Sequence, residues 1–198
     1  MTRRLTDAGF SAVELLIVVA LMGSLAAITV PISGTMIDDI QIRGDAHAVS
    51  GTLALTKMTA AAKFTRARLL VNLGAGTYRI ETWRRTGTPG WVAEGSDLRL
   101  SAQNGFGFGA LPTAPPNTQV ALAQPVPCLD AAEVAIAGTA CVIYNSRGTP
   151  ISAGGAPVTT QAVYLGGPTG VFGVVIGATG QQQVWRSNVM AGGVWVQQ

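Results

Sequence analysis

The apolar residues of the chain are concentrated near its N-terminus. Residues 15–32 read LLIVVALMGSLAAITVPI and contain no charged residue. Together with residues 10–14 they would form a helix of about 34 Å at roughly 1.5 Å per residue, which exceeds a bilayer core of about 30 Å. Arg3 and Arg4 precede this stretch, and basic residues favour the cytoplasmic side. The pattern therefore predicts one membrane-crossing helix, with the rest of the chain outside the cytoplasm.

A helical pattern continues beyond the apolar stretch. Apolar residues recur at steps of three and four, with one step doubled: Ile42, Ala46, Val49, Leu53, Ala60 and Phe64. Charged residues occupy the opposite positions: Asp38, Asp39, Arg43, Asp45, Lys57 and Lys63. This arrangement is typical of a helix with one face packed on the protein and one face in water. We expect one helix from about Phe10 to Thr65, bent at Pro31 because proline removes a backbone hydrogen bond.

After Arg68 the pattern changes to a period of two. Tyr78, Ile80 and Thr82 alternate with polar or aromatic neighbours, as in a half-buried strand. Other short strands are expected at 69–73, 91–92, 98–100, 106–108, 141–144, 162–165, 171–176, 183–185 and 194–196. Residues 111–127 contain five prolines and predict a long surface loop. The expected fold class is α+β, with a long N-terminal helix, half in the membrane and half amphipathic, packed on a mostly antiparallel β head.

Composition excludes several classes of protein. Charged residues make up 12% of the 198 residues, about half the usual share of roughly 25%, and the formal net charge of +3 is too small to indicate nucleic-acid binding by itself. Two cysteines and one histidine are too few for a zinc site built from four such ligands. No hydrolase or metalloprotease motif is present. We therefore expect no enzymatic activity, no cofactor and no metal.

One carboxylate interrupts the apolar stretch. Glu14 follows Gly9-Phe10-Ser11-Ala12-Val13 and precedes residues 15–20, LLIVVA. A carboxylate inside a membrane helix costs about 2.5–3.5 kcal/mol on insertion scales, so its presence indicates a function. This segment resembles the processing site of type IV prepilins and type II secretion pseudopilins, and Pro31 lies where that family often carries a helix-bending proline.

The resemblance implies a processing and assembly pathway. Prepilin peptidase would cut between Gly9 and Phe10 and methylate the new amine of Phe10, and Glu14 would neutralise that amine and set subunit register. The implied domains are a leader peptide at 1–9, a transmembrane and filament-core helix at 10–32, its amphipathic continuation at 33–66, and a periplasmic β-rich head at 67–198. A plain secretory signal, cut near Ala27, and an uncleaved signal anchor are the alternatives.

The second half of the chain resembles the GspH/FimT group of minor pilins and pseudopilins. Residues 142–148, VIYNSRG, are similar to the strand and glycine turn of that group, and residues 171–186 resemble its late strand pair. The resemblance implies a structural minor pilin or pseudopilin of a type IV pilus or type II secretion system, assembled near the filament tip. Its partners would be other pilins or pseudopilins, the prepilin peptidase and the inner membrane, which it would cross once with its head in the periplasm.

Cys128 and Cys141 lie in the region expected to face the periplasm, where disulfides persist. One bridge is the simplest arrangement, and it would stabilise the head by about 3 kcal/mol in the chain-entropy model. Two buried free thiols are the alternative.

DNA is the alternative partner, because some members of the GspH/FimT group bind DNA during natural transformation. Six arginines would form a basic patch if their strands are adjacent: Arg66, Arg68, Arg79, Arg84, Arg85 and Arg99. Trp83, Trp91 and Trp185 could stack on bases, although aromatic residues are used more often in cores. Residues 190–198 contain no basic residue, so the structural role is preferred.

Overall fold

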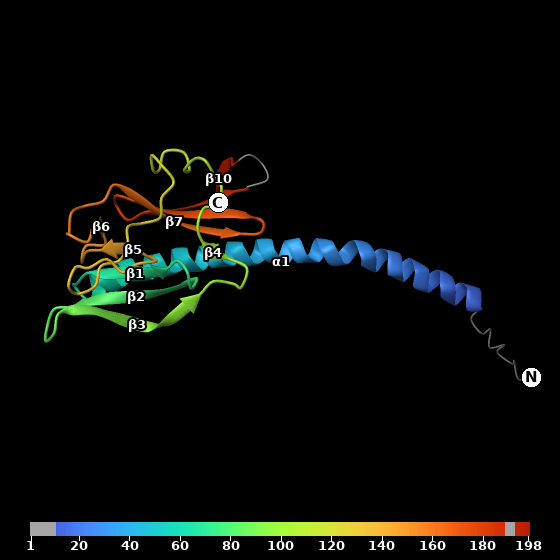
Figure 1. The fold of residues 1–198 in the computed structure, drawn as a ribbon, viewed down its shortest axis with the longest axis horizontal. Helices are drawn as coiled ribbons and strands as arrows, with labels where there is room; N and C mark the ends of the chain where they lie inside the picture. The colour runs from blue at the N-terminus through green and yellow to red at the C-terminus, as the bar shows by residue number, and fades with distance from the viewer. Residues whose placement is uncertain (1–10, 189–192) are drawn as a thin grey trace, which may run out of the picture. The chain divides into compact units, whose positions relative to one another are not determined.

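The structure is a computed structural model that describes residues 11–188 and 193–198, except for the side chains of residues 28–33. It divides into two compact units, Met1–Ile37 and Asp38–Gln198. One helix, α1 (Ala12–Ala62), contributes residues to both units (Figure 1). Phe10, the first residue of the predicted helix, lies outside the described residues. The helix continues through residue 31, and the bend predicted at Pro31 stays a prediction.

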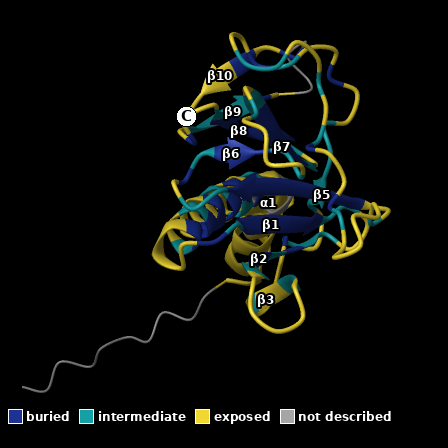
Figure 2. Ribbon diagram, turned by 90° about the vertical axis from the view of Figure 1, so that its left-hand side faces the viewer, coloured by how far each residue is buried: buried dark blue, intermediate teal, exposed yellow. Residues whose placement is uncertain are grey.

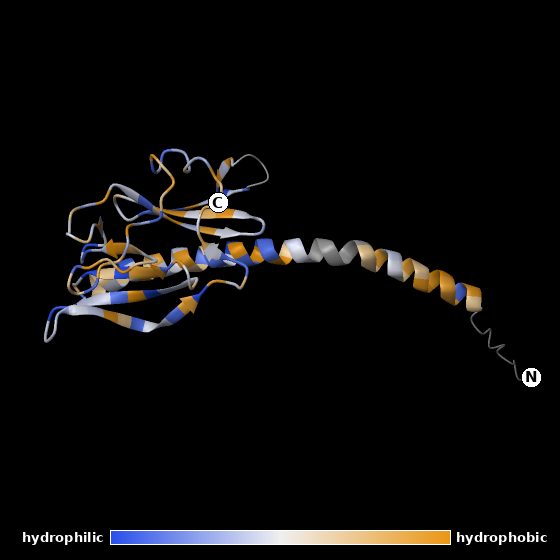
Figure 3. Ribbon diagram, viewed as in Figure 1, coloured by the Kyte–Doolittle hydropathy of each residue, from blue (hydrophilic) through white to orange (hydrophobic). Residues whose placement is uncertain are grey.

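The first unit consists of the N-terminal part of α1. Ser11 precedes the helix, and its hydroxyl accepts a hydrogen bond from the backbone N–H of Val13 at 3.3 Å, as an N-cap residue does. Apolar residues then follow one another along the helix, as the colour of the ribbon shows (Figure 3). All of the large ones from Val13 to Leu25 are exposed, by 41–67%.

No helix in the described part of the chain combines the length and the apolar character that membrane crossing requires. This finding contradicts the predicted transmembrane helix and the single-pass inner-membrane location. Part of the predicted span, Phe10 and the side chains of residues 28–33, lies outside the described residues.

The second unit contains two five-stranded antiparallel sheets. Sheet A has the order β3-β2-β1-β5-β6, and sheet B has the order β10-β9-β8-β7-β4. The strands of sheet A are β1 (Ala67–Asn72), β2 (Thr77–Arg84), β3 (Gly90–Arg99), β5 (Thr139–Tyr144) and β6 (Pro150–Ile151). Those of sheet B are β4 (Gly105–Phe106), β7 (Thr160–Gly167), β8 (Gly170–Gly177), β9 (Gln182–Ser187) and β10 (Trp195–Gln197).

The main core lies where residues 38–62 of α1 meet both sheets. Val49 and Leu53 of the helix share one cluster with Leu69 of β1, Val142 of β5 and Val174 of β8. Figure 2 shows the buried residues concentrated in strands next to this part of α1, with β3 more exposed. We call the face of sheet A that turns away from α1 its outer face.

The buried stripe predicted for the helix is confirmed at five of its six positions. Ile42, Ala46, Val49, Leu53 and Ala60 are all fully buried. Phe64 is the exception, since its side chain is 78% exposed and its φ is +48°. The reason is that α1 has ended: the N–H groups of Phe64 and Thr65 bond back to the carbonyls of Ala61 and Ala60, both at 3.2 Å, in a Schellman cap.

The predicted fold class is contradicted. The described chain is mostly β, with its strands in two antiparallel sheets, rather than a membrane-anchored helix packed on one β head. The strands predicted at 91–92 and 98–100 are one strand, β3, because a bulge opposite Tyr78 and Ile80 interrupts the pattern without ending the strand. Residues 111–127 form no strand, as predicted, and Leu111 and Leu122 pack on sheet B beside Tyr164.

Candidate functional site

Three features of the chain can carry a function: the N-terminal segment with Glu14, the exposed faces of α1, and the arginines of sheet A. Gly9 and Phe10, the predicted cleavage and methylation positions, lie outside the described residues. Glu14 lies in the first turn of α1, three residues after Ser11. A carboxylate there interacts favourably with the free N–H groups of the helix start, so Glu14 has a local structural role independent of any partner.

The N-terminal part of α1 is an exposed apolar surface within its own unit. Nine large apolar side chains are exposed between residues 13 and 25: Val13, Leu15, Leu16, Ile17, Val18, Val19, Leu21, Met22 and Leu25. They surround the helix rather than forming one stripe, because they include consecutive residues. A contiguous exposed apolar surface of this kind normally marks an interaction site.

Residues 38–62 of α1 also have an exposed face, opposite the buried stripe. Ile40, Leu55 and Met58 are 53–67% exposed. Gly44 and Gly51 lie between them at helical spacing, and a Cβ added at either glycine would meet nothing within 4 Å. Small residues flanked by exposed apolar ones permit a second helix to approach closely. We call Ile40, Gly44, Gly51, Leu55 and Met58 the open face of α1.

The six arginines considered as a DNA patch do not all present a free positive charge at the protein surface. Arg68 is buried at 2% exposure, and its guanidinium pairs with the carboxylate of Glu81, with Nε to Oε2 at 2.7 Å. Arg79 is engaged by the same carboxylate at 2.8 Å and by Asp97 at 3.3 Å. Two of the six positive charges are therefore already neutralised by carboxylates within sheet A.

The remaining four arginines lie in three places. Arg84 donates from Nε to the carbonyl of Thr88 at 3.1 Å and lines one hollow with Arg85 and Lys63, whereas Arg99 lies at the end of β3. Arg66, which immediately precedes β1, lies beside the rings of Trp83 and Trp91. The six arginines therefore do not form one basic patch, because two are paired with carboxylates and the other four are divided among three places.

The surroundings of Arg68 and Arg79 shift the pKa values of both side chains. Burial lowers the pKa of Arg68 from its ordinary value, and the opposing effect of Glu81 is smaller. The hydrogen bond to Glu81 is the main cause that raises the pKa of Arg79. Because arginine loses its proton only above about pH 12, both guanidinium groups stay charged at physiological pH. The Glu81 carboxylate therefore holds two permanent cations, one buried and one half-exposed.

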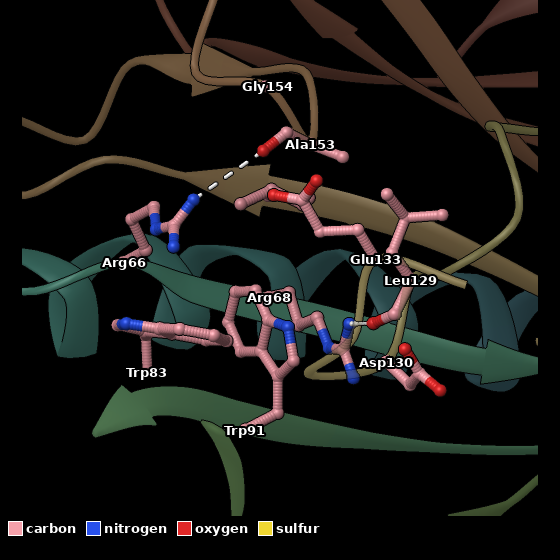
Figure 4. Close-up of a pocket in the computed structure, with 10 residues that line it drawn as sticks. Arg66, Arg68, Trp83, Trp91, Leu129, Asp130, Glu133, Ala153 and Gly154 are labelled. Atoms are coloured by element: carbon pink, nitrogen blue, oxygen red, sulfur yellow. Dashed lines mark hydrogen bonds between the residues drawn. The ribbon is translucent and has the colours of Figure 1, made fainter. Parts of the chain in front are cut away.

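A pocket of about 270 Å³ lies over the outer face of sheet A. Its floor combines arginines and tryptophans: Arg66 lies 4.8 Å from the ring centroid of Trp83, and Arg68 lies 4.0 Å from that of Trp91. The two indoles are neighbours because Trp83 and Trp91 pair directly across β2 and β3. Figure 4 shows Arg66 and Glu133 projecting into this pocket from opposite sides.

The wall of the pocket is a loop held by several bonds. The Cys128–Cys141 disulfide is present, as predicted, and joins the start of the loop to β5. Arg68 donates to the carbonyl of Leu129 at 2.5 Å, and the N–H of Ile136 bonds to the carbonyl of Cys128 at 2.7 Å. Asp130 accepts hydrogen bonds from two N–H groups of its own loop through Oδ1. The wall is therefore fixed by the protein rather than by a ligand.

Sequence reasoning did not find this pocket. The alternation of β1 places Arg66 and Arg68 on one side of the strand, opposite Ala67 and Leu69, and this signal was available. The pairing of Trp83 with Trp91 could not be seen in the sequence, because register is a property of the folded sheet.

Comparisons of the chain with protein-family models, with curated proteins and with solved structures gave no match.

Proposed function

We propose that this chain is a structural subunit of a filament of the type IV pilus or type II secretion pseudopilus kind. In this proposal prepilin peptidase cuts between Gly9 and Phe10, Phe10 is N-methylated, and α1 packs against the helices of other pilins or pseudopilins. The observation that carries the proposal is the run of nine exposed apolar side chains at residues 13–25 of α1, with Glu14 as its one carboxylate.

Packing between subunits would be driven by burial of this surface. Fully burying an aliphatic side chain contributes about 1.5–3 kcal/mol, so each half-exposed side chain would contribute roughly 1 kcal/mol when a neighbouring helix covers it. The sum over nine side chains, about 9 kcal/mol, is comparable to the roughly 5–15 kcal/mol that a single domain gains from folding. Such a surface is therefore more useful in an assembly than in an isolated subunit.

Glu14 would supply specificity that apolar contacts lack. Cleavage after Gly9 would create a positive amine at Phe10, four residues before Glu14 in the sequence. A carboxylate that neutralises an amine in apolar surroundings favours one register over its neighbours, because a displaced helix would leave both charges unpaired. The amine of a neighbouring subunit and the carboxylate of this one would form such a pair.

The first test replaces Glu14 in the native host. We expect Glu14→Ala to leave cleavage intact and to lower incorporation into sheared filaments by about tenfold, the loss of one charge pair worth at least 1.4 kcal/mol. Processing is read from the mass of the protein, and incorporation from immunoblots of the filament fraction. Normal incorporation of the variant would contradict the register role.

The second test uses the open face of α1. Gly51→Leu adds a side chain whose Cβ meets nothing within 4 Å outside the neighbouring helix backbone, and it favours the helix by about 1 kcal/mol relative to glycine. We therefore expect a subunit that is at least as stable as the wild type but is incorporated poorly. The matched control is Gly107→Ala, which also meets nothing within 4 Å but lies in the head, after β4. Equal incorporation of both variants would show that no helix packs on this face.

A further inference from the structure

Arg66 presents a hydrogen-bonding edge that the described residues do not use. Its only hydrogen bond there is a long one, from Nη1 to the carbonyl of Ala153 at 3.5 Å. The edge formed by Nε and Nη2 has no acceptor among those residues. The guanidinium is held in place by the rings of Trp83 and Trp91, at 4.8 and 5.8 Å from their centroids. A fixed planar guanidinium with one open edge is suited to bind a carboxylate through two parallel hydrogen bonds.

Glu133 supplies the opposite charge at the other side of the pocket. It adopts a φ of +63°, a left-handed conformation that costs a non-glycine residue about 1 kcal/mol or more. Its carboxylate forms no hydrogen bond and no ion pair with the described residues, in contrast to Asp130, which is engaged by its own loop. Arg66 and Glu133 both line the pocket without pairing with each other.

Arg68 and Asp130 also line the pocket, but both are bonded to neighbouring protein groups; the rest of the lining is uncharged and the space is small. Leu129, Ile143 and Ala153 form the part of the wall that carries no charge. A volume of about 270 Å³ lies just below the range of about 300–1,000 Å³ that is usual for small-molecule sites. The pocket therefore combines a site for an anion, a site for a cation and an apolar surface within the space of one small molecule.

We propose that this pocket binds a free α-amino acid with an aliphatic side chain. The ligand carboxylate accepts two hydrogen bonds from the Nε and Nη2 edge of Arg66, and its ammonium group pairs with Glu133. The side chain lies against Leu129 and Ile143. This inference goes beyond the filament role, and it does not depend on cleavage, on assembly or on any other subunit.

Other ligands fit these residues less well. A nucleobase needs an open aromatic face, yet Arg66 and Arg68 already lie over the rings of Trp83 and Trp91. The same contacts leave no aromatic cage for a ligand cation. A simple dicarboxylate or phosphate would be attracted by Arg66 and repelled by Glu133, and a neutral sugar would leave both charges unpaired.

The test is titration of the purified full chain with L-leucine, N-acetyl-L-leucine and L-leucinamide, followed by calorimetry and by the NMR signals of the tryptophan indole N–H groups. We expect L-leucine to bind with a dissociation constant below about 1 mM, and each blocked compound to bind about tenfold more weakly because one charge is lost. The indole signals of Trp83 and Trp91 should shift, whereas those of Trp185 and Trp195, which pack on sheet B, should not.

Three variants at Arg66 and Glu133 test the contacts proposed for the two ends of the ligand. Arg66→Gln should weaken binding of L-leucine by about tenfold or more, and Arg66→Lys should weaken it as well, because lysine keeps the charge and loses the planar pair of donors. Glu133→Gln should weaken L-leucine binding and bring the affinity of N-acetyl-L-leucine within about threefold of it. Arg147→Gln is the matched control, since Arg147 is exposed and does not line the pocket.

Several results would overturn the proposal. They are the absence of binding by L-leucine at millimolar concentration, equal affinity for L-leucine and its N-acetyl form, and binding that Arg66→Gln leaves unchanged. Near-ultraviolet circular dichroism and thermal unfolding of each variant establish that it is folded before its affinity is compared. If Arg66→Gln does not fold, Arg66→Lys and Glu133→Gln still decide the question.

Discussion

The buried ion pair beneath the pocket gives a prediction about stability. Arg68 and Glu81 lie on adjacent strands, and their side chains are 3% and 6% exposed. Arg79 bonds to the same carboxylate, yet its side chain is 35% exposed. One carboxylate thus holds a buried cation and a half-exposed cation, which allows the effect of burial to be measured within a single cluster.

The magnitude follows from what each substitution leaves behind. Glu81→Leu removes the carboxylate and leaves the Arg68 guanidinium buried, with one carbonyl bond to Leu129 and one ring contact with Trp91. Removing one partner of a buried pair costs about 3–5 kcal/mol, because the remaining charge is uncompensated. Arg79→Met removes a half-exposed pair and should cost less than about 1 kcal/mol.

The double variant Glu81→Leu with Arg68→Met removes both buried charges and replaces them with apolar side chains. We expect it to recover at least about 2 kcal/mol relative to Glu81→Leu alone, since a buried pair and an apolar replacement are often similar in stability. The assay is urea unfolding of the disulfide-intact full chain, followed by tryptophan fluorescence.

Two outcomes would refute the reasoning. One is a cost for Glu81→Leu no greater than that for Arg79→Met, which would mean that burial of Arg68 carries no penalty. The other concerns the double variant: its loss of stability would equal or exceed the sum of the losses measured for Glu81→Leu and for Arg68→Met separately. Glu81 and Arg68 would then not share one interaction.

Three further predictions concern single residues. Phe64→Gly should stabilise the head by about 0.5–1 kcal/mol in urea unfolding, because glycine adopts the left-handed cap without strain; a loss of stability would mean that the exposed ring is needed. Burial raises the pKa of Tyr164 to about 12. The buried neutral phenol therefore contributes fully to the free energy of unfolding below about pH 10, and this contribution of roughly 2–3 kcal/mol is lost as the pH rises through about 12. Tyr164→Phe should lack this loss of stability at alkaline pH. Reduction of the Cys128–Cys141 bridge should cost about 3 kcal/mol, and a Cys128→Ala, Cys141→Ala variant should show no effect of reductant on its melting temperature.

The helix and most strands could be predicted because they depend on local periodicity. Ile42, Ala46 and Val49 recur with the helical period and are buried, and the cysteine pair was the simplest arrangement of two thiols. Phe64 fits the same period, but a helix end is decided by backbone hydrogen bonds that periodicity does not contain.

The membrane half of the helix was predicted from the length of the apolar stretch at residues 10–32. That prediction is contradicted, because no helix in the described part of the chain combines the length and the apolar character that membrane crossing requires.

The candidate pocket needed the folded sheet. In the sequence, Arg66 and Arg68 are two charges among several, and Trp83 and Trp91 are separated by a turn. Strand register places the two indoles side by side, and the disulfide brings Glu133 over them from a loop far along the chain. The sequence left a basic patch open as the alternative because it does not show that Glu81 neutralises two of the arginines.

The measurement that tests the proposed filament role most directly is the intact mass and N-terminal fragmentation of the mature protein isolated from its native cells. The proposal predicts that the first residue is Phe10 and that its amine carries one methyl group. A first residue of Met1, or a start beyond Ala27 as a plain secretory signal predicts, would contradict it.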